Sequence, residues 1–137
     1  MTNEAVIVEL LGDRGNVIDY TIADASTAEK GTIMMLKDPR TCSGANVAAQ
    51  VLAGIAASEK VLSDGQVNLG CYTYGIFDMV ASGAVTVGNS VMSAADANYP
   101  NTVCETTATT SGAAILGYAL EEAADTEVFE VLVKIGG

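Results

Sequence analysis

The feature that most constrains this chain is a pattern of glycine, alanine and alternating apolar residues that occurs twice. Residues 53–59 read Ala-Gly-Ile-Ala-Ala-Ser-Glu, and residues 116–122 read Leu-Gly-Tyr-Ala-Leu-Glu-Glu. Each copy follows a glycine that enters an apolar stretch, in residues 30–35 and 87–92, and each is followed by an acidic turn and a new strand-like segment. We therefore predict an internal duplication of a strand–turn–strand unit in an all-β chain.

The rest of the chain has the same short-range pattern. In the last segment Phe129, Val131, Val133 and Ile135 alternate with other residues, which is the period of a half-buried strand. About eight short strands, separated by glycine at near-regular spacing, predict one compact small β-barrel or sandwich over residues 1–137. The expected strands are residues 5–11 and 17–23 as a hairpin, 31–36, 67–74, 75–80, 85–88, a short one near Val103, and 129–135.

Residues 45–62 are ambiguous. Val47, Val51, Ile55 and Leu62 approximate helical spacing, and alanine is abundant there. Gly54 and the similarity to residues 116–122 instead favour a strand in the second half. One short helix in this segment stays open.

The composition points to an oligomer. Half of the residues are apolar, but there is no tryptophan, and the aromatic residues are five tyrosines and two phenylalanines. A core of small side chains buries less area per residue. Additional burial between subunits would therefore stabilise the fold.

The charge excludes two classes of partner. Seventeen acidic against six basic residues give a net charge of −11. Binding to DNA or RNA requires clustered lysine and arginine, and an anionic membrane surface would repel the chain. No segment approaches the roughly 20 apolar residues of a membrane span. Two interpretations of the charge remain: solubility, and attraction to a basic partner surface.

The sequence predicts no enzyme, cofactor or metal site. Histidine, the commonest general base and metal ligand, is absent. The chain has three cysteines, Cys42, Cys71 and Cys104, and their spacing does not match a metal site. Because the number is odd, we expect buried free thiols in a protein made in a reducing cytosol. No secretory signal is recognisable at the N-terminus. Glu121 and Glu122 are adjacent and would face opposite sides of a strand.

Two sets of residues are candidates for structural or contact roles. Four glycines are predicted to allow backbone bends or a close approach of strands: Gly31, Gly54, Gly88 and Gly117. One aromatic group is a possible contact patch, because tyrosines spaced by two share a strand face and anchor interfaces: Tyr72, Tyr74 and Phe77. Packing of this group in the core is an equal alternative.

From about residue 20 to the C-terminus, the order of these motifs resembles the head-decoration, or capsid cement, proteins of tailed bacteriophages and related viruses. The resemblance rests on structural glycines and strands in residues 30–32, 38–41, 53–56, 75–78, 83–91 and 116–121.

The resemblance implies a non-enzymatic β-rich virion protein, made in the host cytoplasm. Such proteins bind the outside of the capsid as trimers and clamp neighbouring major capsid subunits. The chain does not show the long flexible N-terminal arm that some decoration proteins use. Two alternatives are another virion component, such as a fibre base or tail part, and a β-barrel that binds a small ligand or carbohydrate.

Overall fold

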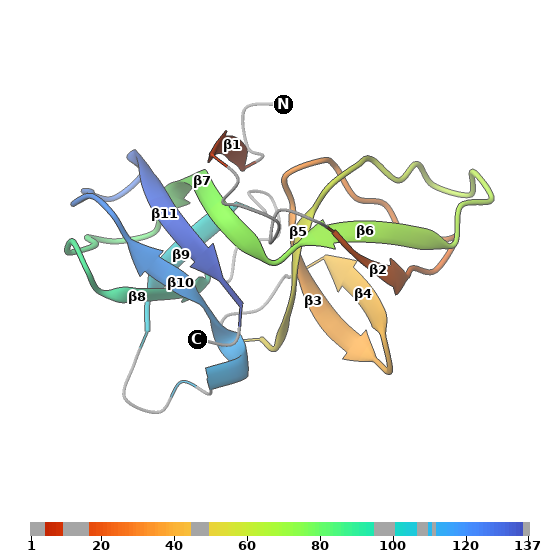
Figure 1. Cartoon of the computed structure of the whole chain (residues 1–137). Helices are drawn as coiled ribbons and strands as arrows, with labels where there is room; N and C mark the ends of the chain where they lie inside the picture. Colours follow the sequence, from red (N-terminus) through yellow and green to blue (C-terminus); the bar gives the residue numbers. More distant parts are fainter. Residues whose placement is uncertain are drawn as a thin grey trace.

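The chain forms an all-β structure (Figure 1). The computed structural model describes residues 5–9, 17–44, 50–94, 101–106, 110 and 112–135. Within these residues there are eleven strands and one turn of 3₁₀ helix, Gly112–Ala114. The strands are β1 (Val6–Glu9), β2 (Ile18–Thr21), β3 (Ile33–Asp38), β4 (Thr41–Gly44), β5 (Leu52–Ala56), β6 (Asn68–Tyr72), β7 (Tyr74–Ala81), β8 (Ser90–Ser93), β9 (Thr102–Glu105), β10 (Ile115–Ala119) and β11 (Val128–Lys134).

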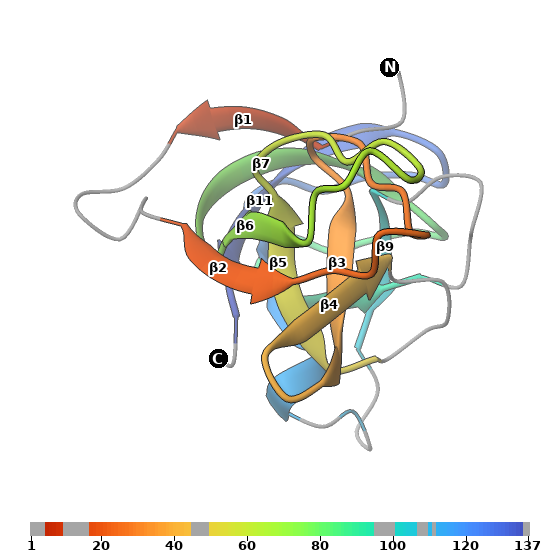
Figure 2. The same ribbon diagram turned by 90° about the vertical axis from the view of Figure 1, so that its right-hand side faces the viewer.

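The strands close into two five-stranded barrels that lie side by side in Figure 1, and Figure 2 shows the pair with β2, β3, β4 and β6 in front. Barrel 1 has the order β2-β4-β3-β5-β6. Barrel 2 has the order β7-β11-β10-β8-β9 and is closed by a parallel pairing of β7 with β9. Strand β1 pairs with β7 on the part of its edge that β9 leaves free.

The two barrels have the same topology, which confirms the predicted duplication and extends it to a whole barrel. Strands β2 to β6 correspond to β7 to β11, and the parallel pair β2–β4 corresponds to β7–β9. Individual hydrogen bonds also correspond. The Gly31 nitrogen donates to the Ala56 oxygen at 2.9 Å, and the Gly88 nitrogen donates to the Ala119 oxygen at 2.8 Å.

The four glycines singled out in the sequence form two equivalent pairs. Gly31 and Gly88 have φ angles of 91° and 84°, in turns where a side chain would be strained. Gly54 and Gly117 lie in β5 and β10. A Cβ at either position would collide with a backbone carbonyl oxygen of the paired strand, that of Tyr72 or Leu132 respectively.

The buried cluster of barrel 2 extends to residues of β3 and β5, while barrel 1 has a second cluster in its interior. Strand β5 is buried along its whole length. Ala53 and Ala56 pack inside barrel 1, whereas Leu52 and Ile55 join the cluster that contains Phe77 of barrel 2. This double burial explains why residues 52–56 are apolar without alternation.

The all-β, barrel-type fold class is confirmed, with two barrels and eleven described strands where one barrel or sandwich of about eight strands was expected. The sequence did not predict β4 as a strand, because Pro39 marks a break there. The chain turns at Arg40, with φ of 47°, and pairing resumes at Thr41. Residues 85–88 were expected to be a strand, but Gly88 interrupts the extended backbone and the strand begins at Ser90.

The expected hairpin of residues 5–11 and 17–23 is also wrong. Strand β1 pairs with β7, and β2 pairs with β4 and β6, because barrel 1 is closed by its own five strands. In the ambiguous segment, residues 45–49 lie outside the described residues, and residues 52–56 are a strand. The alternation in the last strand is confirmed, since Phe129, Val131 and Val133 are buried.

Candidate functional site

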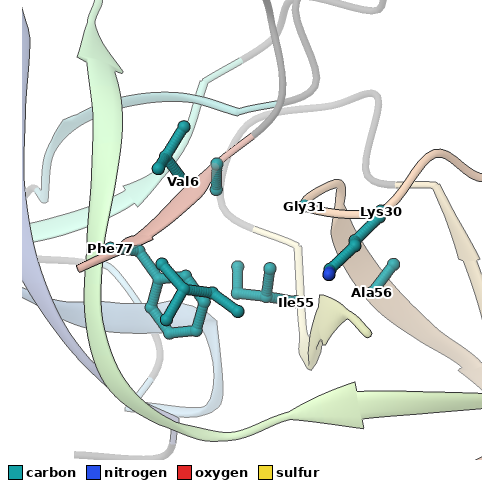
Figure 3. Close-up of a pocket in the computed structure, with 8 residues that line it drawn as sticks. Val6, Lys30, Gly31, Ile55, Ala56 and Phe77 are labelled. Atoms are coloured by element: carbon teal, nitrogen blue, oxygen red, sulfur yellow. The ribbon is translucent and has the colours of Figure 1, made fainter. Parts of the chain in front are cut away.

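A cavity lies between the two barrels (Figure 3). It has a volume of about 290 Å³, and Val6, Ile55 and Phe77 line its apolar side. Lys30 is the charged residue of the lining, and it extends toward the cavity from the wall that carries Gly31. Among the described residues that line the cavity, Lys30 is the one titratable group, so these residues can hold an apolar group but do not provide the paired groups of an acid–base catalyst.

The structure places the three aromatic residues of the predicted contact patch in different environments, although two of them are in contact. Phe77 is fully buried in the cluster that extends from barrel 2 to β3 and β5. Tyr72 ends β6 and packs against Phe77, with 6.0 Å between ring centroids and 46° between ring planes. Tyr74 begins β7, so the two half-buried tyrosines lie on different strands, and a contact role for them stays a prediction.

The outer face of barrel 2 carries an apolar row that the sequence analysis did not single out. Ile76, Leu132 and Tyr118 are in register on β7, β11 and β10, so their side chains lie next to one another on one face. Tyr118 is 41% exposed. On the same face the Asp78–Glu130 pair lies on one side of Ile76 and Leu132, and the Tyr74–Lys134 pair lies on the other, so this apolar surface has charged residues on both sides.

Barrel 1 contains a buried ion-pair cage that the sequence analysis also missed. The Lys60 ammonium, whose side chain is 0% exposed, lies 2.8 Å from Asp64 Oδ1 and 3.2 Å from Asp24 Oδ1. Burial lowers the pKa of Lys60, but hydrogen bonds to Asp64 and Asp24 outweigh this effect and leave the pKa raised. The same hydrogen bond from Lys60, with one from the Gln66 backbone, lowers the pKa of Asp64 to about 2.

The cysteines are free thiols, as expected, and two of them are inside barrel 1. Cys42 and Cys71 are buried in the cluster that includes Leu69. The thiol of Cys71 hydrogen-bonds to that of Cys42, which lowers the pKa of Cys42 and raises that of Cys71. Burial raises the pKa of Cys104, which is half-buried on β9.

The described part of the chain contains no cluster of three or more cysteine, aspartate or glutamate residues that could hold a metal ion. It also contains no helix that is long and apolar enough to cross a membrane.

A family model described as phage cement protein matches residues 12–135, which is most of the chain. The chain belongs to the phage cement protein family. It is therefore a capsid-associated structural protein of a phage, and the resemblance noted in its sequence is confirmed.

This cement protein also has a solved structural neighbour. The crystal structure of the N base of the head fibre protein gp8.5 of bacteriophage phi29 is similar over 86% of this chain and 92% of that chain, with a TM-score of 0.53. At 12% sequence identity this similarity shows the fold alone. No curated protein matches.

Proposed function

We propose that this protein binds the outer surface of the phage capsid as a trimer and stabilises the head by clamping neighbouring major capsid subunits. The observation that carries the proposal is the family match over residues 12–135. A trimer in which each subunit makes modest contacts with more than one capsid subunit would bind tightly through multivalency.

The proposed mechanism is non-enzymatic. The described lining of the cavity between the barrels contains one titratable side chain, Lys30, and we expect the surfaces of the twin barrels to act by contact. We propose that the row of Ile76, Leu132 and Tyr118 is one contact surface, because apolar side chains that are exposed or only partly buried, with a polar border, are typical of interfaces. Tyr72 and Tyr74 are a second, smaller candidate.

Heads made with and without the protein test this proposal. Purified heads should contain it in stoichiometric amounts, heads that lack it should open at a lower temperature, and the purified protein added back should restore heat resistance. Light scattering should give the mass of a trimer. A strictly monomeric protein that is absent from heads would refute the proposal.

The similarity to a head fibre base favours one second candidate, in which this protein is the base of a surface fibre. That function predicts few copies for each head and unchanged heat resistance after removal. Mass spectrometry of separated heads and tails, with copy numbers, distinguishes the two functions.

A further inference from the structure

Each barrel has an isolated backbone bridge between two loops, at Ala28 and Lys60 in barrel 1 and at Val85 and Ala123 in barrel 2. A lysine stands in this bridge in barrel 1 only. In barrel 1, Ala28 and Lys60 exchange backbone hydrogen bonds of 3.0 and 2.7 Å. In barrel 2, Val85 and Ala123 exchange hydrogen bonds of 2.8 and 3.0 Å. Ala123 therefore occupies the position in barrel 2 that Lys60 occupies in barrel 1.

The turn that follows is the same in both barrels. The Asp64 nitrogen donates to the Val61 oxygen at 3.3 Å, and the Glu127 nitrogen donates to the Ala124 oxygen at 3.1 Å. The carboxylates are placed alike as well. Asp64 Oδ2 accepts from the Val61 nitrogen at 3.2 Å, and Glu127 Oε1 accepts from the Ala124 nitrogen at 2.6 Å.

The loop that faces the turn also corresponds. Ser63 and Thr126 have positive φ angles of 55° and 70°. Their nitrogens donate to the carbonyl oxygens of Asp24 and Ala81, each at 2.8 Å. The backbone around the lysine site is thus reproduced in barrel 2.

In barrel 1 these groups bind an ammonium. Lys60 Nζ donates to the Val61 oxygen at 2.7 Å, to Asp64 Oδ1 at 2.8 Å, to the Asp24 oxygen at 3.0 Å and to Asp24 Oδ1 at 3.2 Å. Two backbone carbonyls and two carboxylates therefore replace the water around a fully buried cation.

In barrel 2 three of the four acceptors have a counterpart without a lysine: the carbonyls of Ala81 and Ala124 and the carboxylate of Glu127. Ala81 stands where barrel 1 has Asp24, so the Asp24 carboxylate has no counterpart. Ala124 and Glu127 line the groove. Ala123 fills less space than Lys60, and the groove there measures about 560 Å³ against about 350 Å³ in barrel 1. Its seven lining residues include Glu122 and Glu127 and no lysine or arginine.

We propose that the groove at Ala123 receives a lysine side chain from the surface of the capsid protein, in the place that Lys60 fills in barrel 1. This inference rests on the proposed capsid-binding function and specifies its chemistry. The small ammonium on a flexible stem suits a groove lined by the carboxylates of Glu122 and Glu127. A second copy of this chain is a poorer source, because it carries only six lysine and arginine residues against seventeen acidic ones.

The direct test is a substitution that places a lysine of the protein itself in the groove. Ala123→Lys places a lysine where barrel 1 has one, and Ala25→Lys adds the same charge to an exposed loop of barrel 1 as a control. Binding to capsids assembled without this protein is measured by co-sedimentation. We expect Ala123→Lys to bind at least about tenfold more weakly, since one charge-assisted contact is lost, and Ala25→Lys to bind like the wild type.

A second pair of variants keeps the test decisive if Ala123→Lys does not fold. Glu127→Gln should also weaken capsid binding, and Glu121→Gln, an exposed neighbour outside the groove, should not. Folded Ala123→Lys that binds capsids like the wild type would overturn the proposal, as would equal effects of the two glutamine substitutions.

A capsid-free measurement separates this inference from the proposed function. In an NMR titration with N-acetyl-lysine methylamide, the backbone amides of residues 84–86 and 122–127 should shift, and the norleucine analogue should leave them unchanged. If the wild type does not bind capsids at all, the proposed function fails. Equal shifts with both compounds, or no shifts, would refute the lysine site itself.

Discussion

A substitution at the repeated glycines tests the duplicated-barrel architecture most sharply. In Gly117→Ala the new Cβ would collide with the Leu132 carbonyl oxygen and lie 2.8 Å from the Leu132 carbonyl carbon and 3.0 Å from the Val133 Cα. All three atoms belong to the backbone of β11, to which β10 is paired, so no side-chain rotation can relieve the contact. Strand β10 would have to move away from its partner.

The size of the effect follows from this geometry. Overpacking costs about 1–3 kcal/mol, and we expect the upper end because backbone blocks the new group. For a chain of this length about 3 kcal/mol lowers the melting temperature by roughly 10 °C. Gly54→Ala should behave alike, because its Cβ would meet the Tyr72 carbonyl oxygen and its φ is 151°.

Gly44→Ala is the matched control for these variants. Gly44 also lies in a strand, β4, and nothing lies within 4 Å of an added Cβ there. It should keep wild-type stability or gain a few tenths of a kcal/mol from the stiffer unfolded chain. The assay is urea unfolding followed by circular dichroism. Gly117→Ala within about 0.5 kcal/mol of Gly44→Ala would refute the close-approach argument.

Three further predictions follow from the core, the thiols and the ion-pair cage. Calorimetry should show one unfolding transition, because the barrels share a buried cluster; two separated transitions would show that they fold independently. A thiol reagent should modify Cys104 before Cys42 and Cys71, which are buried, as peptide mapping can verify; equally fast modification of Cys71 would contradict the barrel packing. Asp64, with a pKa of about 2 against a usual 3.8, stabilises the fold above about pH 4, and this contribution is lost as the pH falls toward 2. The difference in melting temperature between wild type and Asp64→Asn should therefore vanish near pH 2, and a constant difference would contradict the ion pair.

Local patterns in the sequence predicted the local structure. The alternation of Phe129, Val131 and Val133 correctly identified the inward face of β11, and the two glycine motifs identified β5 and β10 as equivalent. These signals are local because a strand has a period of two and a close approach requires glycine.

Pairings between distant segments were not predictable in this way. The pairing of β1 with β7 and the closure of each barrel by a parallel strand pair depend on residues far apart in the chain. Lys60 also has no local signature, because Asp24 lies 36 residues away and the lysine resembles any surface residue in the sequence. Phe77 fitted a contact patch and the core equally well until the strands on both sides of it were placed.

Cryo-electron microscopy of phage heads, with and without this protein, tests the central claim most directly. A difference map should show paired barrels on the outside of the shell, in contact with more than one capsid subunit and repeated over the whole lattice. Density confined to a few fibre bases or to the tail, or no difference on the shell, would contradict a cement function.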